Sequence, residues 1–264
     1  MIRVYAIASG KGGTGKTTVT ANLGPMLARH GRRTCILDAD TGMANLALIL
    51  GLENLPVTLH EVLAGKASIQ DAIYDGPLGV KIIPSGLSLQ GFQSANPDRL
   101  KEVLQDLVDD FDIMLLDAPA GISKDGVIPL AVADEVLLIV NPEISSIVDA
   151  IKTRTLTEMI GGHVAGAIMN RVTTNNGEMS RAQMQNLLGV RVIGFIPEDP
   201  YVRRSSAARM PVVLKYPSSD ASQAFSRISA GLAGIEYQAE EAVANASREG
   251  FVDRLARVLF RGKT

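Results

Sequence analysis

The stretch ASGKGGTGKTTVT, residues 8–20, satisfies the phosphate-loop pattern G-x-x-x-x-G-K-[ST], with its fixed positions at Gly10, Gly15, Lys16 and Thr17. The apolar run 2–8 precedes it and a helical pattern follows, which is the context that the motif requires. Backbone N–H groups and a helix N-terminus then face an anion, and glycines let the chain approach it closely. We therefore predict a phosphate-binding loop made of Gly10, Lys11, Gly12, Gly13, Thr14, Gly15, Lys16, Thr17 and Thr18.

A second motif overlaps this loop. Residues 10–15, GKGGTG, also fit the G-x-G-x-x-G pattern of a dinucleotide-binding fold, with Asp38 and Asp40 following after about 20 residues. Two features favour a nucleoside triphosphate instead. One is the KTT that completes the first pattern, and the other is Asp117, which ends the very apolar segment IMLLD as a Walker B aspartate does. We predict that Lys16 contacts the β- and γ-phosphates and that Thr17 and Asp117 hold Mg²⁺.

Apolar runs alternate with amphipathic helical patterns along the chain. The predicted strands are 2–8, 34–37, 80–83, 112–116, 135–140, 164–169 and 190–195. The predicted helices are 16–30, 97–110, 144–160, 178–188 and 219–237, several of them begun by Ser, Asn or Asp. This alternation predicts an α/β fold: one doubly wound, mainly parallel sheet with helices on both faces, in a single P-loop domain over residues 1–238.

Two acidic residues, Asp38 and Asp40, follow the predicted strand 34–37. Aspartates are common in turns at such places. A pair at the carboxyl end of a parallel strand, however, faces the same crevice as the phosphate loop. Such carboxylates can help to hold the metal shell or position the attacking water, and we assign Asp38 to the metal site.

Charge and composition limit the class of protein. The chain has 264 residues, a net charge of −2 and one cysteine, Cys35, so no internal disulfide is possible. No apolar stretch reaches the length of about 18 residues that a membrane span needs, and the N-terminus has no long apolar signal region. These features predict a cytoplasmic chain, and its overall charge argues weakly against general polyanion binding.

Several segments together resemble the deviant Walker A ATPases and, within them, the MinD group of cell-division site regulators. The segments are SGKGGTGKTT at 9–18, DADTGMANL at 38–46, LLDAPAGI at 115–122, MNRV at 169–172 and IPEDPYVRRSS at 197–206. A short amphipathic tail completes the similarity, which covers nearly the whole chain. The resemblance implies slow, dimer-dependent hydrolysis of ATP with Mg²⁺.

The resemblance also implies roles for individual residues. Lys11 would reach across a dimer to the phosphates held by the other subunit, where a cation stabilises the charge of the transition state. Asp40 would orient the hydrolytic water. The adenine would be lined by Asn170, Pro197, Glu198 and Asp199. From the residues alone, Lys11 could instead attract phosphate within its own subunit, and Asn170 could be a turn former.

The C-terminal segment differs from the body of the chain. Residues 239–247 form a polar tether, and residues 248–264 carry five basic side chains against two acidic ones. On a helical wheel, an arc about 120° wide holds the apolar residues Phe251, Val252, Leu255, Val258 and Leu259, with arginines along one flank. This pattern predicts a helix that binds an anionic membrane surface, and the alternative is a last helix packed on its own domain.

Together with the resemblance, these observations predict an ATP-hydrolysing homodimer that is cytoplasmic when free and binds the inner face of the cell membrane reversibly when it holds ATP. It would position septum-site or other polar machinery through activator or cargo proteins that the sequence does not identify. One alternative is a ParA-like DNA-partitioning ATPase that uses the basic cluster Arg203, Arg204 and Arg209. Another is a nucleotide-dependent scaffold for motility or polar proteins.

Overall fold

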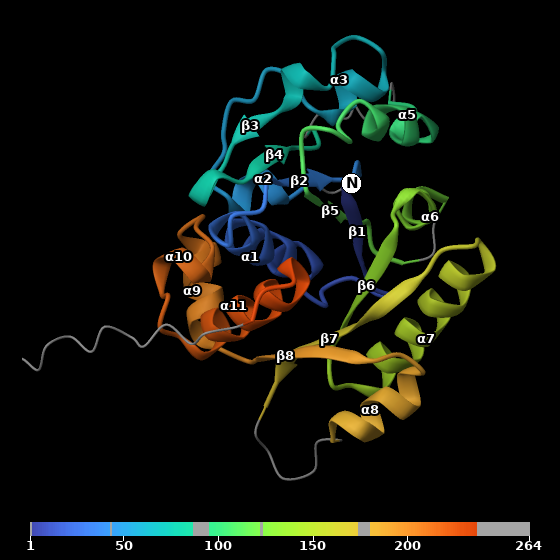
Figure 1. Ribbon diagram of the computed structural model, residues 1–264, viewed down its shortest axis with the longest axis vertical. Helices are drawn as coiled ribbons and strands as arrows, with labels where there is room; N and C mark the ends of the chain where they lie inside the picture. The colour runs from blue at the N-terminus through green and yellow to red at the C-terminus, as the bar shows by residue number, and fades with distance from the viewer. Residues whose placement is uncertain (1, 43, 87–94, 122–123, 174–179, 237–264) are drawn as a thin grey trace, which may run out of the picture.

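A computed structural model describes residues 2–42, 44–86, 95–121, 124–173 and 180–236 (Figure 1). These residues form one eight-stranded sheet with the order β3-β4-β2-β5-β1-β6-β7-β8. The strands are β1 Arg3–Ala8, β2 Thr34–Asp38, β3 Tyr74–Asp75, β4 Lys81–Ile83, β5 Ile113–Asp117, β6 Glu135–Val140, β7 Val164–Val172 and β8 Val192–Pro197. Neighbouring strands run parallel except β3, which pairs antiparallel with β4 at one edge.

The predicted fold class is confirmed. All seven predicted strands exist, and β2 and β5 are buried along their whole length because helices cover both faces of the sheet. The sequence missed β3, since two residues are too few to show a period. It also ended the strand 164–169 too early: β7 continues to Val172 and carries the predicted site residue Asn170 within it.

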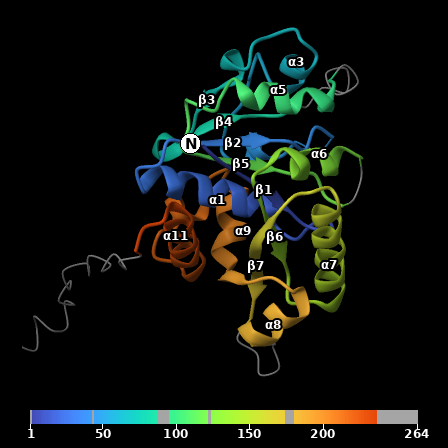
Figure 2. The ribbon, with the colours of Figure 1, turned by 45° about the vertical axis from the view of Figure 1, so that its right-hand side comes forward.

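Helices cover the sheet on two sides (Figures 1 and 2). The α-helices are α1 Lys16–Arg29, α2 Leu46–Ile49, α3 Leu59–Leu63, α5 Leu100–Gln105, α6 Lys124–Val132, α7 Ile144–Met159, α8 Arg181–Leu188, α9 Pro200–Ala207, α10 Val212–Lys215 and α11 Asp220–Ala233. Short 3-10 helices are η1 Gln70–Ala72, η2 Pro77–Gly79 and η3 Pro97–Arg99. On one face, α11 packs beside α1 although the two are far apart in sequence; α3, α5, α6, α7 and α8 cover the other face.

The alternating side chains of β1 illustrate the two layers. Tyr5 and Ile7 enter the core beneath α1 and α11, whereas Ala6 and Ala8 enter the core beneath α6 and α7. Because successive side chains of a strand point to opposite faces, a central strand needs apolar residues at every position. This explains why the strands read as unbroken apolar runs in the sequence.

The predicted helices at 16–30, 144–160, 178–188 and 219–237 are present with somewhat different bounds, and Ser180 and Ser219 cap the starts of α8 and α11. The prediction for 97–110 was too long, because α5 ends at Gln105. Aspartates follow it at 106, 109 and 110, and negative charge at a helix C-terminus opposes the helix dipole. The sequence missed α2, α3, α6, α9 and α10, most of which are short.

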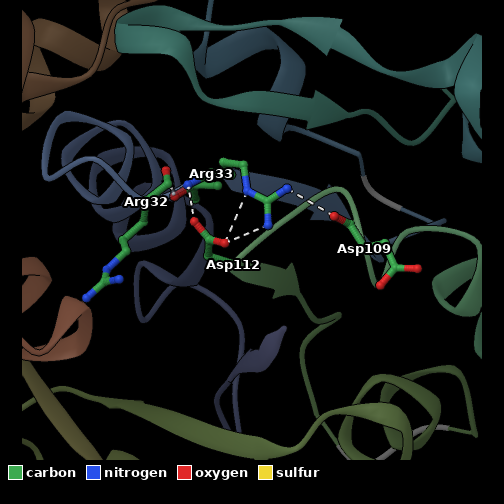
Figure 3. A network of polar contacts seen from close by, with 5 residues as sticks. Arg32, Arg33, Asp109 and Asp112 are labelled. Carbon is green, nitrogen blue, oxygen red and sulfur yellow. Dashed lines mark hydrogen bonds and ion pairs between the residues drawn. The ribbon is translucent and has the colours of Figure 1, made fainter. Parts of the chain in front are cut away.

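An ion-pair network joins the starts of β2 and β5 (Figure 3). The Arg33 guanidinium donates to Oδ1 of Asp112 at 2.8 and 3.1 Å, and the Arg33 backbone N–H donates to Oδ2 at 2.9 Å. Arg33 also donates to the carbonyl of Asp109 at 3.0 Å. These contacts lie at the amino end of the two strands, whose register pairs Thr34 with Ile113 at this end and Asp38 with Asp117 at the other.

None of the helices in the described part of the chain is long and apolar enough to cross a membrane. The predicted tether 239–247 and the predicted membrane-binding residues Phe251, Val252, Leu255, Val258 and Leu259 lie outside the described residues. The division of the chain into a domain, a tether and a terminal helix therefore stays a prediction.

Candidate nucleotide-binding site

The phosphate loop joins β1 to α1 at the carboxyl edge of the sheet. Gly15 immediately precedes α1 with a φ of 97°, a left-handed conformation that favours glycine. A Cβ at this position would also lie 2.4 Å from Nδ2 of Asn170. At Gly10, a Cβ would lie 2.3 Å from the carbonyl oxygen of Asp149 in α7. The backbone conformation thus favours glycine at position 15, and close packing leaves no room for a Cβ at positions 10 and 15.

Asn170 supports this loop from β7. The side chain is buried, and its Nδ2 donates to the carbonyl oxygen of Thr14 at 2.7 Å. In the same loop, the buried hydroxyl of Thr14 has no hydrogen-bond partner among the described residues. A buried polar atom without a partner is costly, so this hydroxyl fits a loop whose remaining partner is a bound anion.

Lys16 lies inside the loop and is 8% exposed. Its Nζ donates to Oγ of Ser9 at 3.2 Å. Burial lowers the pKa of Lys16, and the negative charges of Asp117 and Asp40 only partly oppose this effect. A buried ammonium in the same loop as the unpartnered Thr14 hydroxyl is suited to bind a phosphate, whose negative charge would balance the positive charge of Lys16.

The predicted metal residues come together at the ends of β2 and β5. Asp38 and Asp117 are register partners and are each 1% exposed. Burial is the main cause that raises the pKa of Asp117 to about 6, although hydrogen bonds from Thr17 and Thr20 and the charge of Lys16 act in the opposite direction. The pKa of Asp38 is raised well above its usual value, first by burial and then by the charge of Asp117.

This arrangement fits a divalent cation. Two buried carboxylates repel each other, and a cation between or beside them would keep both ionised. Within the described residues, no group of three or more His, Cys, Asp or Glu side chains is arranged so that it could hold a metal ion by itself. The predicted donors are two carboxylates and the Thr17 hydroxyl, a set that suits Mg²⁺ because this ion keeps several waters and binds few protein ligands beside phosphates.

Asp40 follows β2 in the loop that leads to α2 and is partly buried. Its backbone N–H donates to Oδ1 of Asp38 at 3.1 Å, and its charge contributes to the electrostatics of Lys16. The structure therefore brings Asp40 to the same site as the phosphate loop and the two buried carboxylates.

Lys11 points away from the loop that contains it. Its Nζ donates to Oε2 of Glu143 at 2.7 Å and to Oγ of Ser145 at 3.0 Å, both at the start of α7. The Lys11 side chain is 31% exposed, and its hydrogen bond and charge lower the pKa of Glu143. The two lysines thus differ in place: Lys16 occupies the phosphate loop, and the Lys11 ammonium lies at the start of α7.

Two adjoining cavities surround the loop, with volumes of about 520 and 490 Å³. The first is lined by all the predicted adenine residues, Asn170, Pro197, Glu198 and Asp199. The second is lined by phosphate-loop residues together with Asn45, Leu48 and Ile49. The two share lining residues Gly15, Thr18, Arg171 and Ser206, so they form one continuous groove along the start of α1.

The cavity lining adds residues that sequence reasoning did not place here. Arg171, Arg203 and Arg204 line the larger cavity, and Arg171 also lines the smaller one. Arg171 has a φ of 57°, which is uncommon outside glycine, and in the sequence it follows Asn170 within the segment MNRV that contributes to the family resemblance. Both carboxylate oxygens of Asp199 are occupied, since they accept from the N–H groups of Tyr201 at 2.8 Å and Ala221 at 3.2 Å. An adenine base in this cavity would therefore contact the backbone of Asp199 rather than its side chain.

A glycine-rich loop before a helix, a buried loop lysine and a carboxylate pair at the carboxyl edge of a parallel sheet define a P-loop nucleotide-binding protein. The family model described as "CobQ/CobB/MinD/ParA nucleotide binding domain" matches residues 5–212. The chain belongs to this family. The prediction of a MinD/ParA-type P-loop ATPase that uses ATP and Mg²⁺ is confirmed at this level.

Individual relatives share most of the chain. An uncharacterized ATP-binding protein of Methanocaldococcus jannaschii is 49% identical, over 98% of this chain and 97% of that protein. The septum site-determining protein MinD of Pyrococcus horikoshii, solved with Mg-ADP, is 37% identical with a TM-score of 0.84, over 88% and 96% of the two chains. MinD in a MinC:MinD cell division complex of Aquifex aeolicus is 32% identical with a TM-score of 0.78, over 89% and 98%.

Proposed function

We propose that this protein is an ATP-dependent dimeric switch that attaches to the membrane in its ATP form and positions cell-division or other polar machinery. The observation that carries the proposal is the place of Lys11. Its ammonium lies at the start of α7 and does not line the two cavities, while Lys16 already occupies the phosphate loop. To reach the phosphates of another copy, Lys11 would leave its ion pair with Glu143, which is exposed and therefore weak.

In this proposal, Thr17, Asp38 and Asp117 hold Mg²⁺, which neutralises charge on the phosphates when it is bound. Asp40 orients a water that attacks the γ-phosphorus. The bond from that phosphorus to the bridging oxygen of ADP breaks, and phosphate leaves with the oxygen of the water. Lys16 and the Lys11 of a second copy stabilise the negative charge that spreads over the γ-phosphoryl oxygens.

Membrane attachment is assigned to the tail. The apolar arc of residues 251–259 is short, so one copy would bind a bilayer weakly and reversibly. Two copies joined by ATP would have a high effective concentration at the surface and would bind far more tightly. Dimerisation by ATP would therefore act as the attachment signal, and hydrolysis would act as the release.

The comparisons support the choice of task. Septum-site determination and cell division are named for MinD proteins of similar fold and length, one of them solved together with MinC. By this likeness, we extend the role in septum positioning and the use of a protein partner to this chain.

Pelleting with anionic liposomes tests the membrane step. The full chain is expected to pellet in ATP but not in ADP, and a variant without residues 248–264 is expected to stay in the supernatant in both. Vesicles of neutral lipid are the control. If DNA rather than lipid stimulates hydrolysis and removal of the tail changes nothing, a DNA-partitioning function replaces this one.

A Lys11→Ala variant tests the dimer step. Specific activity of the wild-type protein should rise with protein concentration, because the active site is completed by a second copy. The variant should bind ATP within about threefold of wild type, since Lys16 remains, and lose nearly all concentration-dependent hydrolysis, as an arginine-finger deletion does. Normal dimers and turnover in Lys11→Ala would contradict the proposal.

A further inference from the structure

Asp40 lies between β2 and α2, where residues 39–42, 44 and 45 are described. The two ends of this loop are held by the strand edge. The Ala39 N–H donates to the carbonyl of Asp117 at 3.0 Å, and the Leu46 N–H donates to Oδ2 of Asp38 at 3.3 Å. Between these points the loop must keep its shape if the Asp40 carboxylate is to point in a defined direction.

His60 contacts the middle of this loop from outside it. The side chain belongs to α3 and is 1% exposed, and its Nε2 lies 3.0 Å from the carbonyl oxygen of Thr41. Because a carbonyl oxygen only accepts hydrogen bonds, Nε2 carries the proton in this contact. Thr41 directly follows Asp40 and is itself 6% exposed, so this bond is shielded from water.

The imidazole is held tightly in this position. Oγ of Ser85, after β4, lies 3.4 Å from the same Nε2. Gly86 leaves the space that the ring fills, since a Cβ there would lie 2.4 Å from Nδ1 of His60. The start of α3 is fixed by a capping box in which the Thr58 N–H donates to Glu61 at 2.8 Å. A ring confined in this way holds the Thr41 carbonyl in one place.

His30 makes a similar hydrogen bond at a place that does not affect the nucleotide site. His30 also forms a hydrogen bond within the fold, from Nε2 to Oγ of Ser229 at 3.1 Å. That contact joins the end of α1 to α11 and involves two side chains away from the nucleotide groove. His60 contacts backbone one residue from Asp40, so its loss would change the geometry of the site.

We propose that His60 is a positioning residue for ATP hydrolysis. Its Nε2–H holds the Thr41 carbonyl, and the backbone that joins Thr41 to Asp40 carries this restraint to the Asp40 carboxylate, which then points toward the attacking water. This inference rests on the role proposed above for Asp40. Nucleotide affinity depends on the phosphate loop and the two cavities, which His60 does not line, so His60 acts on turnover rather than on binding.

Three variants test the inference by steady-state phosphate release. His60→Phe keeps a ring of similar size but removes the donor, and kcat should fall about tenfold with KM for ATP within about twofold. His60→Gln places an amide N–H near the position of Nε2 and should keep at least about half of wild-type kcat. Gly86→Ala displaces the ring without changing its chemistry and should reproduce most of the loss.

The matched control is His30→Phe, which should leave kcat and KM unchanged. A purely structural role for His60 predicts that His60→Gln loses as much activity as His60→Phe, and this outcome overturns the proposal. Wild-type kcat in His60→Phe overturns it as well. If His60→Phe does not fold, the other two variants test the proposal. The expected result is near-normal kcat in His60→Gln and a loss of kcat in Gly86→Ala, and a loss in His60→Gln or wild-type kcat in Gly86→Ala overturns the proposal.

Asp40→Ala, measured in parallel, separates this inference from the proposed function. If Asp40→Ala hydrolyses ATP at the wild-type rate, the role of Asp40 fails, and the inference about His60 fails with it. If Asp40→Ala is inactive and His60→Phe is fully active, the role of Asp40 stands and only the role of His60 is overturned. Faster backbone hydrogen exchange in the loop of the His60→Phe protein is the expected direct sign of lost positioning.

Discussion

The two ends of the strand pair β2 and β5 differ in how their carboxylates are stabilised. At the amino end, Asp112 accepts hydrogen bonds from Arg33, and this lowers the pKa of Asp112. At the carboxyl end, Asp38 and Asp117 face each other in a buried position, and the pKa of each is raised. At the amino end, the charge of the carboxylate is balanced by Arg33 within the fold. At the carboxyl end, the balancing charge would come from a bound cation. This difference indicates that the carboxyl end of the strand pair is the end that binds the metal and the nucleotide.

The largest expected effect is at the carboxyl end. Asp117→Asn removes one of the two carboxylates that are proposed to hold Mg²⁺, and hydrolysis should fall by a factor on the order of 100 or more. Phosphate release measured over a range of Mg²⁺ concentrations checks this. Asp112→Asn, at the amino end of the same strand pair, is the control and should keep near-normal turnover. Equal losses in the two variants would remove the distinction between the ends.

The pH dependence of stability sharpens the comparison. The pKa of Asp117 is raised to about 6 in the folded state, from 3.8, so the folded protein binds this proton more tightly than the unfolded chain does. The nucleotide-free protein should therefore gain stability as the pH falls from about 7 to 4, by an amount on the order of 3 kcal/mol or less. Urea unfolding at several pH values measures this. The Asp117→Asn variant should lose that part of the pH dependence.

Asp112 should contribute in the opposite direction. Its pKa is lowered in the folded state, so the stability that it supplies is present above 3.8 and is lost as the pH falls through the folded value. Mg²⁺ with nucleotide should flatten the dependence between pH 7 and 4, because a bound cation keeps the buried carboxylates ionised. A pH profile that is the same with and without Mg²⁺ and nucleotide would argue against a cation at this pair.

The smallest expected effect is at the amino end. Arg33→Met breaks an exposed ion pair, and such pairs contribute little in water. The melting temperature should fall by no more than about 3 °C, and hydrolysis should stay within about twofold of wild type. Differential scanning calorimetry with a parallel activity assay checks both. A large loss of activity would mean that the register set at this end controls the site more strongly than we infer.

Sequence reasoning was most successful where a local pattern has one structural solution. The phosphate loop, the flanking strand and helix, and the carboxylates after two strands all lie as predicted, because parallel strands place their carboxyl ends at one edge. It failed for α2 and α3, which are too short to show a helical period. No pattern in the sequence indicated that His60, in α3, contacts the loop of Asp40.

The sequence by itself determined the class of site, since the order of glycines, lysine and threonine in residues 8–20 specifies a backbone shape that binds phosphate. It also determined the layered fold, because fully apolar strands must be covered on both faces. Only the tertiary structure decided where each lysine lies, which oxygens of Asp199 are already bonded, and how His60 meets Thr41. Those contacts join residues that are distant in sequence, and their geometry depends on packing that no local pattern encodes.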